Sequence, residues 1–158
     1  MYSDMNLRNS NNMEEIKAGD IMLGNWFQVN GFLMYIDAIY SDMVSLDFKG
    51  NEGGSWEEYT KDLVPIPLTE DVLLKCGFEK LPHMTVTNSM MLDIGRERYI
   101  SIGDIDNCNQ MMWLQSIAGK NVTDLICLHN YDYDGWLYVH KLQNIVKSLT
   151  GNELKIEV

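Results

Sequence analysis

Residues 21–48 read IMLGNWFQVNGFLMYIDAIYSDMVSLDF, and this stretch decides the fold of the first half of the chain. Runs rich in β-branched and aromatic residues, which favour strands, are separated by the turn-forming pairs Asn30-Gly31 and Ser41-Asp42. Asn-Gly accommodates the positive φ angles of a tight hairpin turn. The pattern therefore predicts three consecutive antiparallel strands, over 21–29, 32–40 and 43–48.

The residues that follow extend this sheet without leaving room for a helix. A glycine-rich loop over 49–55 precedes a short strand over 56–59, and Asp62 to Pro65 indicates a turn into an edge segment. Closing a sheet of short strands into a barrel removes its exposed edges. We therefore predict a flexible tail over 1–15, rich in Asn and Ser, and then a small SH3-like antiparallel β-barrel over 16–68.

A short helix is the best-marked local element of the second half. Thr69 can accept a hydrogen bond from the backbone N–H groups at a helix N-terminus, and Glu70 and Asp71 suit the positive end of the helix dipole. Gly77 is the residue type that ends helices in the left-handed conformation. The sequence predicts a linker helix between Thr69 and Gly77, entered through the proline-restricted, extended segment 65–68.

Short apolar runs separated by turn residues then predict an antiparallel β-meander. Its expected strands span 84–87, 90–94, 98–102, 111–117 and 122–129. Apolar residues at spacings of three and four predict a helix over about 138–150, and alternating Leu154, Ile156 and Val158 predict a terminal strand. The region 69–158 is thus expected to be an α+β unit in which a helix packs on one face of a sheet.

Composition and charge narrow the class of protein. The chain has 158 residues, 46% of them hydrophobic and 22% charged, which suits one globular domain or two very small ones. With 12 basic against 23 acidic residues the formal net charge is −11, which disfavours nucleic-acid binding through Lys and Arg. Three widely spaced cysteines, no apolar stretch near the N-terminus and no run of membrane-spanning length predict a soluble cytoplasmic protein with no membrane contact.

Several short motifs, taken in order, resemble a known family. They are GNW at 24–26, PIPLTE at 65–70 running into LKCGF at 74–78, and VHKLQN at 139–144 ending in LTGNEL at 149–154. Together they resemble a family of small uncharacterised Bacteroides proteins that often occur in prophage or mobile-element settings. The resemblance implies the barrel, the linker helix, the C-terminal helix and a bacterial or phage cytoplasm. It implies no activity, cofactor or catalytic residue.

Aromatic side chains concentrate in the predicted barrel, and SH3-like domains present an aromatic groove to extended peptides. The candidate binding residues are Trp26, Tyr35, Trp56 and Tyr59, with Phe27 beside them. The alternative is that a barrel this small uses some of these rings for its own core.

The acidic loops suggest two kinds of metal site. Asn130, Asp132 and Asp134 followed by Gly135 match the first half of a calcium-binding loop, but Lys141 stands where a bidentate Glu is needed. An exposed polar turn is the alternative interpretation. The carboxylates that would have to converge for metal-dependent hydrolysis are Asp93, Asp104, Asp106, Asp132 and Asp134.

Cys127 and His129 lie two residues apart on one face of a predicted strand, with Cys108 and His140 elsewhere. A structural zinc site needs four ligands, usually in close pairs, and only one close pair is present. A buried cysteine and a half-buried histidine are the alternative. A Cys–His nucleophile built on Cys76, Cys108 or Cys127 has no flanking signature.

The sequence contains no complete catalytic constellation and no phosphate-binding loop, so we predict no catalytic residue and no cofactor. We expect a non-enzymatic protein-binding or adaptor protein whose partner is another protein. Two alternatives stay open. One is an acidic decoy that inhibits a DNA-binding enzyme by its charge, and the other is a metal-dependent hydrolase that uses the loop carboxylates.

Overall fold

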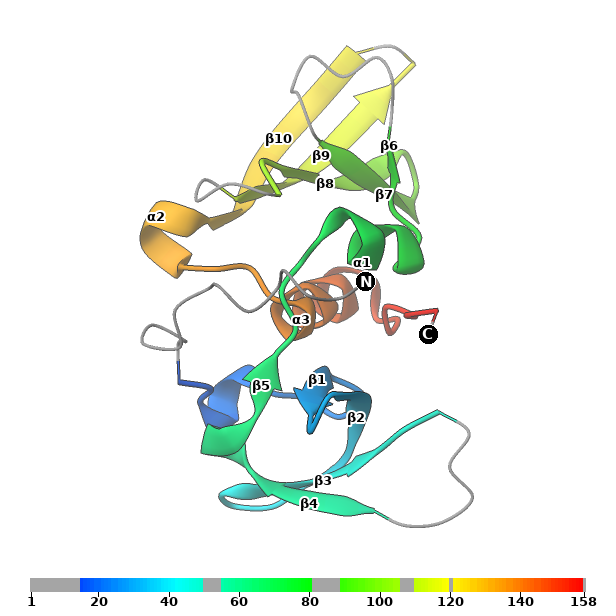
Figure 1. The fold of residues 1–158 in the computed structure, drawn as a ribbon. Coiled ribbons are helices and arrows are strands. Elements are labelled where there is room, and N and C mark those ends of the chain that lie inside the picture. Colours follow the sequence, from blue (N-terminus) through cyan, green and yellow to red (C-terminus); the bar gives the residue numbers. More distant parts are fainter. Residues whose placement is uncertain (1–14, 50–54, 81–88, 106–109, 120, 158) are drawn as a thin grey trace.

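The computed structural model describes residues 15–49, 55–80, 89–105, 110–119 and 121–157. They form two antiparallel five-stranded sheets and one long helix near the C-terminus, which confirms the α+β class. Figure 1 shows the sheets at opposite ends of the molecule, with the helix α3 (Val139–Thr150) between them. No helix in this described part of the chain is long and apolar enough to span a membrane.

The first sheet is built around the Asn-Gly turn. Its strands, β1 (Trp26–Val29), β2 (Phe32–Ile39), β3 (Met43–Asp47), β4 (Trp56–Tyr59) and β5 (Val64–Pro65), lie in the order β4-β3-β2-β1-β5. Asn30 and Gly31 have φ angles of 49° and 85°, so the predicted hairpin turn is present. The sheet curls around a hydrophobic core that includes Phe27, Ile36 and Leu46 (Figure 1).

The first strand is shorter than predicted because the expected first half of it forms a turn. The 3-10 helix η2 (Ala18–Asp20) comes first, and the Asn25 side chain then accepts a hydrogen bond from the Met22 N–H at 2.7 Å. β1 therefore begins only at Trp26. A second 3-10 helix, η3 (Thr60–Asp62), leads from β4 to β5.

The linker helix forms where its capping residues predict it. In α1 (Glu70–Lys75), the Thr69 hydroxyl accepts a backbone N–H hydrogen bond at 3.3 Å. At the other end Gly77 has a φ of 84°, and the Phe78 N–H donates to the Leu73 carbonyl at 3.0 Å. Leu73 and Phe78 are both buried in the core of the second sheet, so the end of the helix is anchored there.

The second sheet follows the order of the chain. Its strands are β6 (Glu79–Lys80), β7 (Met90–Gly95), β8 (Arg98–Gly103), β9 (Met111–Ala118) and β10 (Asn121–Asn130), each paired antiparallel with the next. The short β6 forms where the sequence predicts no strand, and it pairs with the first two residues of β7. The strand predicted over 84–87 lies outside the described residues.

The helix α3 packs against both sheets. Its Val139, Leu142 and Val146 side chains are buried in the core of the second sheet, as the apolar spacing predicts. On another side of the helix, the His140 ring stacks on Phe27 of the first sheet with ring centroids 5.0 Å apart. The predicted division into two units at the end of the first sheet stays a prediction.

The predicted terminal strand is wrong for the residues described. Residues 153–157 belong to neither sheet, and the Glu157 N–H donates to the Lys75 carbonyl of α1 at 3.0 Å. Their side chains still alternate between exposed and buried, as in an extended chain, and Leu154 reaches the core of the second sheet. The apolar alternation therefore reflects one-sided burial of an extended segment rather than strand pairing.

Candidate binding groove

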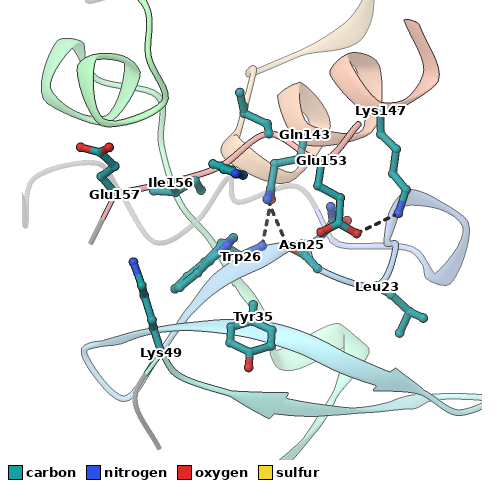
Figure 2. A pocket seen from close by; sticks show the side chains of 13 residues that line it. Leu23, Asn25, Trp26, Tyr35, Lys49, Gln143, Lys147, Glu153, Ile156 and Glu157 are labelled. Atoms are coloured by element: carbon teal, nitrogen blue, oxygen red, sulfur yellow. Dashed lines mark hydrogen bonds and ion pairs between the residues drawn. The ribbon is translucent and has the colours of Figure 1, made fainter. Parts of the chain in front are cut away.

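A groove of about 420 Å³ lies between the first sheet and the segment 153–157. Figure 2 shows Trp26 and Tyr35 on one side of it, and residues of 153–157 together with α3 on the other. Its volume falls within the roughly 300–1,000 Å³ that is usual for ligand pockets. The groove joins parts of the chain that are more than a hundred residues apart.

Two of the four predicted aromatic residues form the floor of this groove. Trp26 on β1 lies directly opposite Tyr35 on β2, so the two side chains project from the same face of the sheet. Their ring centroids are 5.4 Å apart, and the ring planes are tilted by 55°. Strand register and ring contact thus hold this aromatic pair in place.

The Tyr35 hydroxyl bonds to an acidic neighbour on the next strand. It donates to Asp47 Oδ2 at 3.5 Å, and Tyr35 and Asp47 lie opposite each other in the β2–β3 pair. Desolvation raises the pKa of the Tyr35 phenol, and the carboxylates of Asp47 and Asp37 raise it further. The hydroxyl therefore stays protonated at neutral pH, and the aromatic floor carries no charge.

Positive side chains gather around the groove although the chain is acidic. Lys49, Lys147 and Lys155 line it against two glutamates, a local balance of +1 in a chain of −11. Lys147 Nζ forms an ion pair with Glu153 Oε1 at 3.3 Å, and Figure 2 shows Lys49 standing beside Trp26. Lys49 and Lys155 are exposed, so both can meet a carboxylate that lies in the groove.

The segment 153–157 lines the groove and leaves most of its backbone N–H groups without a partner among the described residues. Within the described residues the N–H groups of 153–156 donate no hydrogen bond, whereas the Glu157 N–H is taken by α1. Leu154 and Ile156 hold the segment in place by packing on the core of the second sheet. Unpaired main-chain groups beside a side-chain pocket are what peptide-binding domains use to add an extended peptide.

A buried amide ties the groove floor to α3. Gln143, 6% exposed, accepts from the Trp26 N–H at 2.9 Å and donates to the Gly24 carbonyl at 3.1 Å. Beside it, Asn25 Nδ2 donates to Asn144 Oδ1 at 2.9 Å. The helix thus bonds to the backbone at the start of β1, and this bonding sets Trp26 beneath the C-terminal segment (Figure 2).

Gln143→Leu is expected to lower the free energy of unfolding by about 2 kcal/mol, because it leaves one backbone donor and one backbone acceptor without partners. Urea unfolding followed by circular dichroism measures this loss. The matched control is Gln28→Leu on β1, where the glutamine is exposed and the change should stay within about 0.5 kcal/mol. Equal losses in the two variants would show that the Gln143 bonds do not stabilise the fold.

Trp56 and Tyr59 lie outside this groove. Both belong to β4, at the edge of the first sheet, and are 46% and 47% exposed. Tyr59 borders a separate hollow, and its ring centroid is 5.7 Å from the Lys61 ammonium. Phe27 is fully buried and belongs to the core. The structure therefore brings together only Trp26 and Tyr35 of the predicted aromatic set.

The acidic loop that begins at Asn130 uses its oxygens on its own backbone. Tyr131–Asp134 form the short helix α2, and Asn130 Oδ1 accepts from the Asp132 N–H at 3.0 Å. Asp134 Oδ2 accepts from the Asn130 N–H at 2.9 Å, and Lys141 Nζ donates to the Asp134 carbonyl at 3.3 Å. A capped turn accounts for these contacts, and calcium binding by Asn130, Asp132 and Asp134 stays a prediction.

The other carboxylates named for metal chemistry occupy separate turns. Asp93 Oδ1 accepts from the Gly95 N–H at 2.7 Å in the turn that follows β7, and Asp104 has a φ of 52° at the end of β8. Asp106 lies outside the described residues. Among those that are described, no three His, Cys, Asp or Glu side chains are grouped to hold a metal. The metal-dependent hydrolase and the acidic decoy both stay predictions.

Cys127 and His129 occupy different environments from those predicted. A bulge between Cys127 and His129 breaks the strand alternation, so Cys127 is exposed while His129 is buried and bonds through Nε2 to the Gly135 carbonyl at 3.0 Å. Burial raises the pKa of Cys76 to about 11, and its thiol stays protonated. Cys108 lies outside the described residues.

His140 is buried between two aromatic rings rather than bound at a site. Its ring lies 5.0 Å from Phe27 and 6.0 Å from Tyr138, and its Nδ1 has no hydrogen-bond partner among the described residues. Burial, together with a smaller effect of the Lys141 charge, lowers the pKa of His140 to about 4, and Asp20 opposes the shift. The imidazole is therefore neutral in the folded protein at neutral pH.

Acidification from pH 7 to pH 5 is expected to remove about 2 kcal/mol of stability through His140, at about 1.4 kcal/mol per pKa unit. The unfolded histidine binds a proton below pH 6.5 and the folded one only below about pH 4. This contribution is therefore complete above pH 6.5 and declines as the pH falls toward 4. Urea unfolding at both pH values measures it, and His140→Phe keeps the ring and removes the titration. Identical pH dependence in both proteins would contradict the prediction.

Sequence reasoning misses half of the groove. Lys49 follows the third strand without any pattern, and Gln143 and Lys147 lie on the polar side of a predicted helix. For this missed half, the apolar alternation over 153–157 is the one pattern in the sequence, and it predicts a paired strand rather than a segment that lines a groove. Comparisons with known proteins find no matching family model, no matching curated protein and no matching solved structure.

Proposed function

We propose that the protein is a non-enzymatic binding module that takes an extended segment of a partner protein in the groove over Trp26 and Tyr35. The observation that carries this proposal is the aromatic pair set beside the segment 153–156, whose backbone N–H groups donate to no residue that the structure describes. A large apolar side chain of the partner rests on the two rings, and its main chain bonds to the wall.

The aromatic contact supplies most of the affinity. A buried aromatic anchor at an interface contributes about 2 kcal/mol or more, whereas an exposed ion pair contributes about 0–1 kcal/mol. Lys49 and Lys155 therefore select a carboxylate next to the inserted side chain without dominating binding. Because the whole chain carries −11, a strongly acidic partner is repelled at long range, and we expect one or two carboxylates rather than an acidic tract.

The first sheet supports a finer interpretation of the fold. Five short antiparallel strands that curl around a small core, with aromatic rings on one face, are consistent with an SH3-like barrel used for peptide recognition. The motif order that resembles small Bacteroides and mobile-element proteins supports a bacterial or phage cytoplasm as the setting of such a module. Both interpretations belong to the proposal.

A peptide selection tests this function. A random peptide library displayed on phage is passed over the immobilised full chain, after depletion on the Trp26→Ala variant. We expect enrichment of peptides that carry one large apolar residue flanked by Asp or Glu. Failure to enrich any such sequence, or equal capture by the depleting variant, would refute the proposal.

A further inference from the structure

The segment 153–157 is extended, although it belongs to neither sheet. Its side chains alternate between exposed and buried positions, and Leu154 and Ile156 are the two that pack on the core of the second sheet. This is the two-residue period of a β-strand. In such a chain the N–H and C=O groups of one residue point to one edge, and those of the next residue point to the other edge.

One hydrogen bond indicates which edge each residue faces. The Glu157 N–H donates to the carbonyl of Lys75, the last residue of α1, at 3.0 Å. Residues two apart share an edge, so the backbone groups of Lys155 also point toward α1. Leu154 and Ile156 alternate with these residues. Their N–H and C=O groups therefore lie on the edge that faces away from α1.

This second edge borders the groove. Figure 1 shows the segment between α1 and the hairpin of β1 and β2, and the groove lies between the segment and that hairpin. Neither Leu154 nor Ile156 forms a backbone hydrogen bond with any residue that the structure describes. The two residues are about 7 Å apart, as alternate strand residues are, and together they direct two donors and two acceptors at the groove.

We propose that the partner segment pairs as a β-strand with the backbone of Leu154 and Ile156, an inference that rests on the peptide-binding function proposed above. An edge that presents donors and acceptors in alternation is complementary to another peptide main chain. A phosphate or a lone carboxylate would use only the N–H groups and would be repelled by the carbonyls. The occupant is therefore an extended peptide. Its alternate residues bond to the segment, while the residue between them points its N–H and C=O away.

The groove then recognises two properties of that peptide separately. Trp26 and Tyr35 receive one large apolar side chain, and the lysines on the rim meet a neighbouring carboxylate. Strand pairing requires in addition that two alternate residues of the peptide carry a backbone N–H, whichever way the peptide runs. Proline is therefore excluded from both of these positions and accepted at the position between them.

Amide hydrogen exchange in the ¹⁵N-labelled full chain tests which edge is used. With a selected peptide at about ten times its dissociation constant, exchange of the Leu154 and Ile156 amides should slow roughly tenfold, because they exchange only from the unbound chain. The Glu153 and Lys155 amides are the internal control and should keep their rates. Equal slowing at all four positions, or no slowing at Leu154 and Ile156, would overturn the strand pairing.

The Trp26 indole N–H resonance, recorded in the same samples, separates this result from the proposed function. An indole that shifts on binding while Leu154 and Ile156 exchange as before would keep the groove as the binding site and refute the pairing. An indole that does not respond to the peptide would refute both.

A scan of the selected peptide tests the alternation from the partner's side. N-methylation of one backbone nitrogen at a time should weaken binding roughly tenfold or more at two alternate residues and by about twofold or less at the residue between them. Alanine at the same positions keeps the N–H and reports the share of the side chain. Equal losses on N-methylation of consecutive residues would contradict the pairing.

Discussion

Phe27→Ala is expected to lower the free energy of unfolding by about 4 kcal/mol, which makes it the most destabilising single substitution considered for this chain. The Phe27 ring is fully buried among the core residues of the first sheet and also stacks on His140 of α3. Its removal leaves a cavity at the point where the helix meets the sheet. Small domains have about 5–15 kcal/mol of stability, so the loss is a large fraction of the total.

The matched control for this substitution is Phe32→Ala, because Phe32 belongs to the same hairpin and is 69% exposed. It should change the free energy of unfolding by less than about 0.5 kcal/mol. Urea unfolding at pH 7 compares the two variants, and Phe27→Leu, which refills part of the cavity, should fall between them. A small loss of unfolding free energy for Phe27→Ala would show that the packing of Phe27 does not stabilise the contact between the first sheet and α3.

The second large effect concerns binding. Trp26→Ala is expected to weaken binding of a selected peptide by about 2 kcal/mol, roughly 30-fold, because the indole is half of the groove floor. Isothermal titration calorimetry with the full chain measures the dissociation constant. Trp26 also packs partly on the core of the second sheet, so the thermal unfolding of the Trp26→Ala variant is measured alongside the titration to separate lost binding from lost stability.

Trp56→Ala is the control for the loss of a tryptophan side chain as such. Trp56 is an exposed tryptophan of the same sheet, and it lies outside the groove. Its affinity for the peptide should equal that of wild type. Lys49→Glu, at an exposed position on the groove rim, should weaken binding by only a few-fold, since an exposed ion pair contributes about 0–1 kcal/mol. A Trp56→Ala loss equal to that of Trp26→Ala would place the binding site on β4.

Local signals explain what the sequence predicts well. The Asn30-Gly31 turn, the Thr69 cap and the Gly77 terminus each depend on interactions within a few residues, and all three occur in the structure. The apolar spacing of α3 likewise depends only on helix periodicity. Such features can be read from one sequence because the groups that satisfy each backbone N–H or carbonyl lie close along the chain.

Long-range contacts explain what the sequence does not predict. The groove exists because 153–157 returns to the first sheet and because the Gln143 amide accepts a hydrogen bond from the Trp26 N–H. Neither contact has a local pattern. The bulge beside His129 also has none, although it separates the exposed Cys127 from the buried His129. Periodicity sets which residues can share a face, and tertiary packing decides which of them do.

The most direct test of the central claim is an NMR titration of the ¹⁵N-labelled full chain with a selected peptide. The Trp26 indole N–H resonance, assigned with a Trp26→Phe variant, and the backbone amides of 153–156 should shift together and saturate at one dissociation constant. The Trp56 indole resonance should not move. Shifts confined to β4 or to the loop after β10, with the Trp26 indole unchanged, would contradict the account.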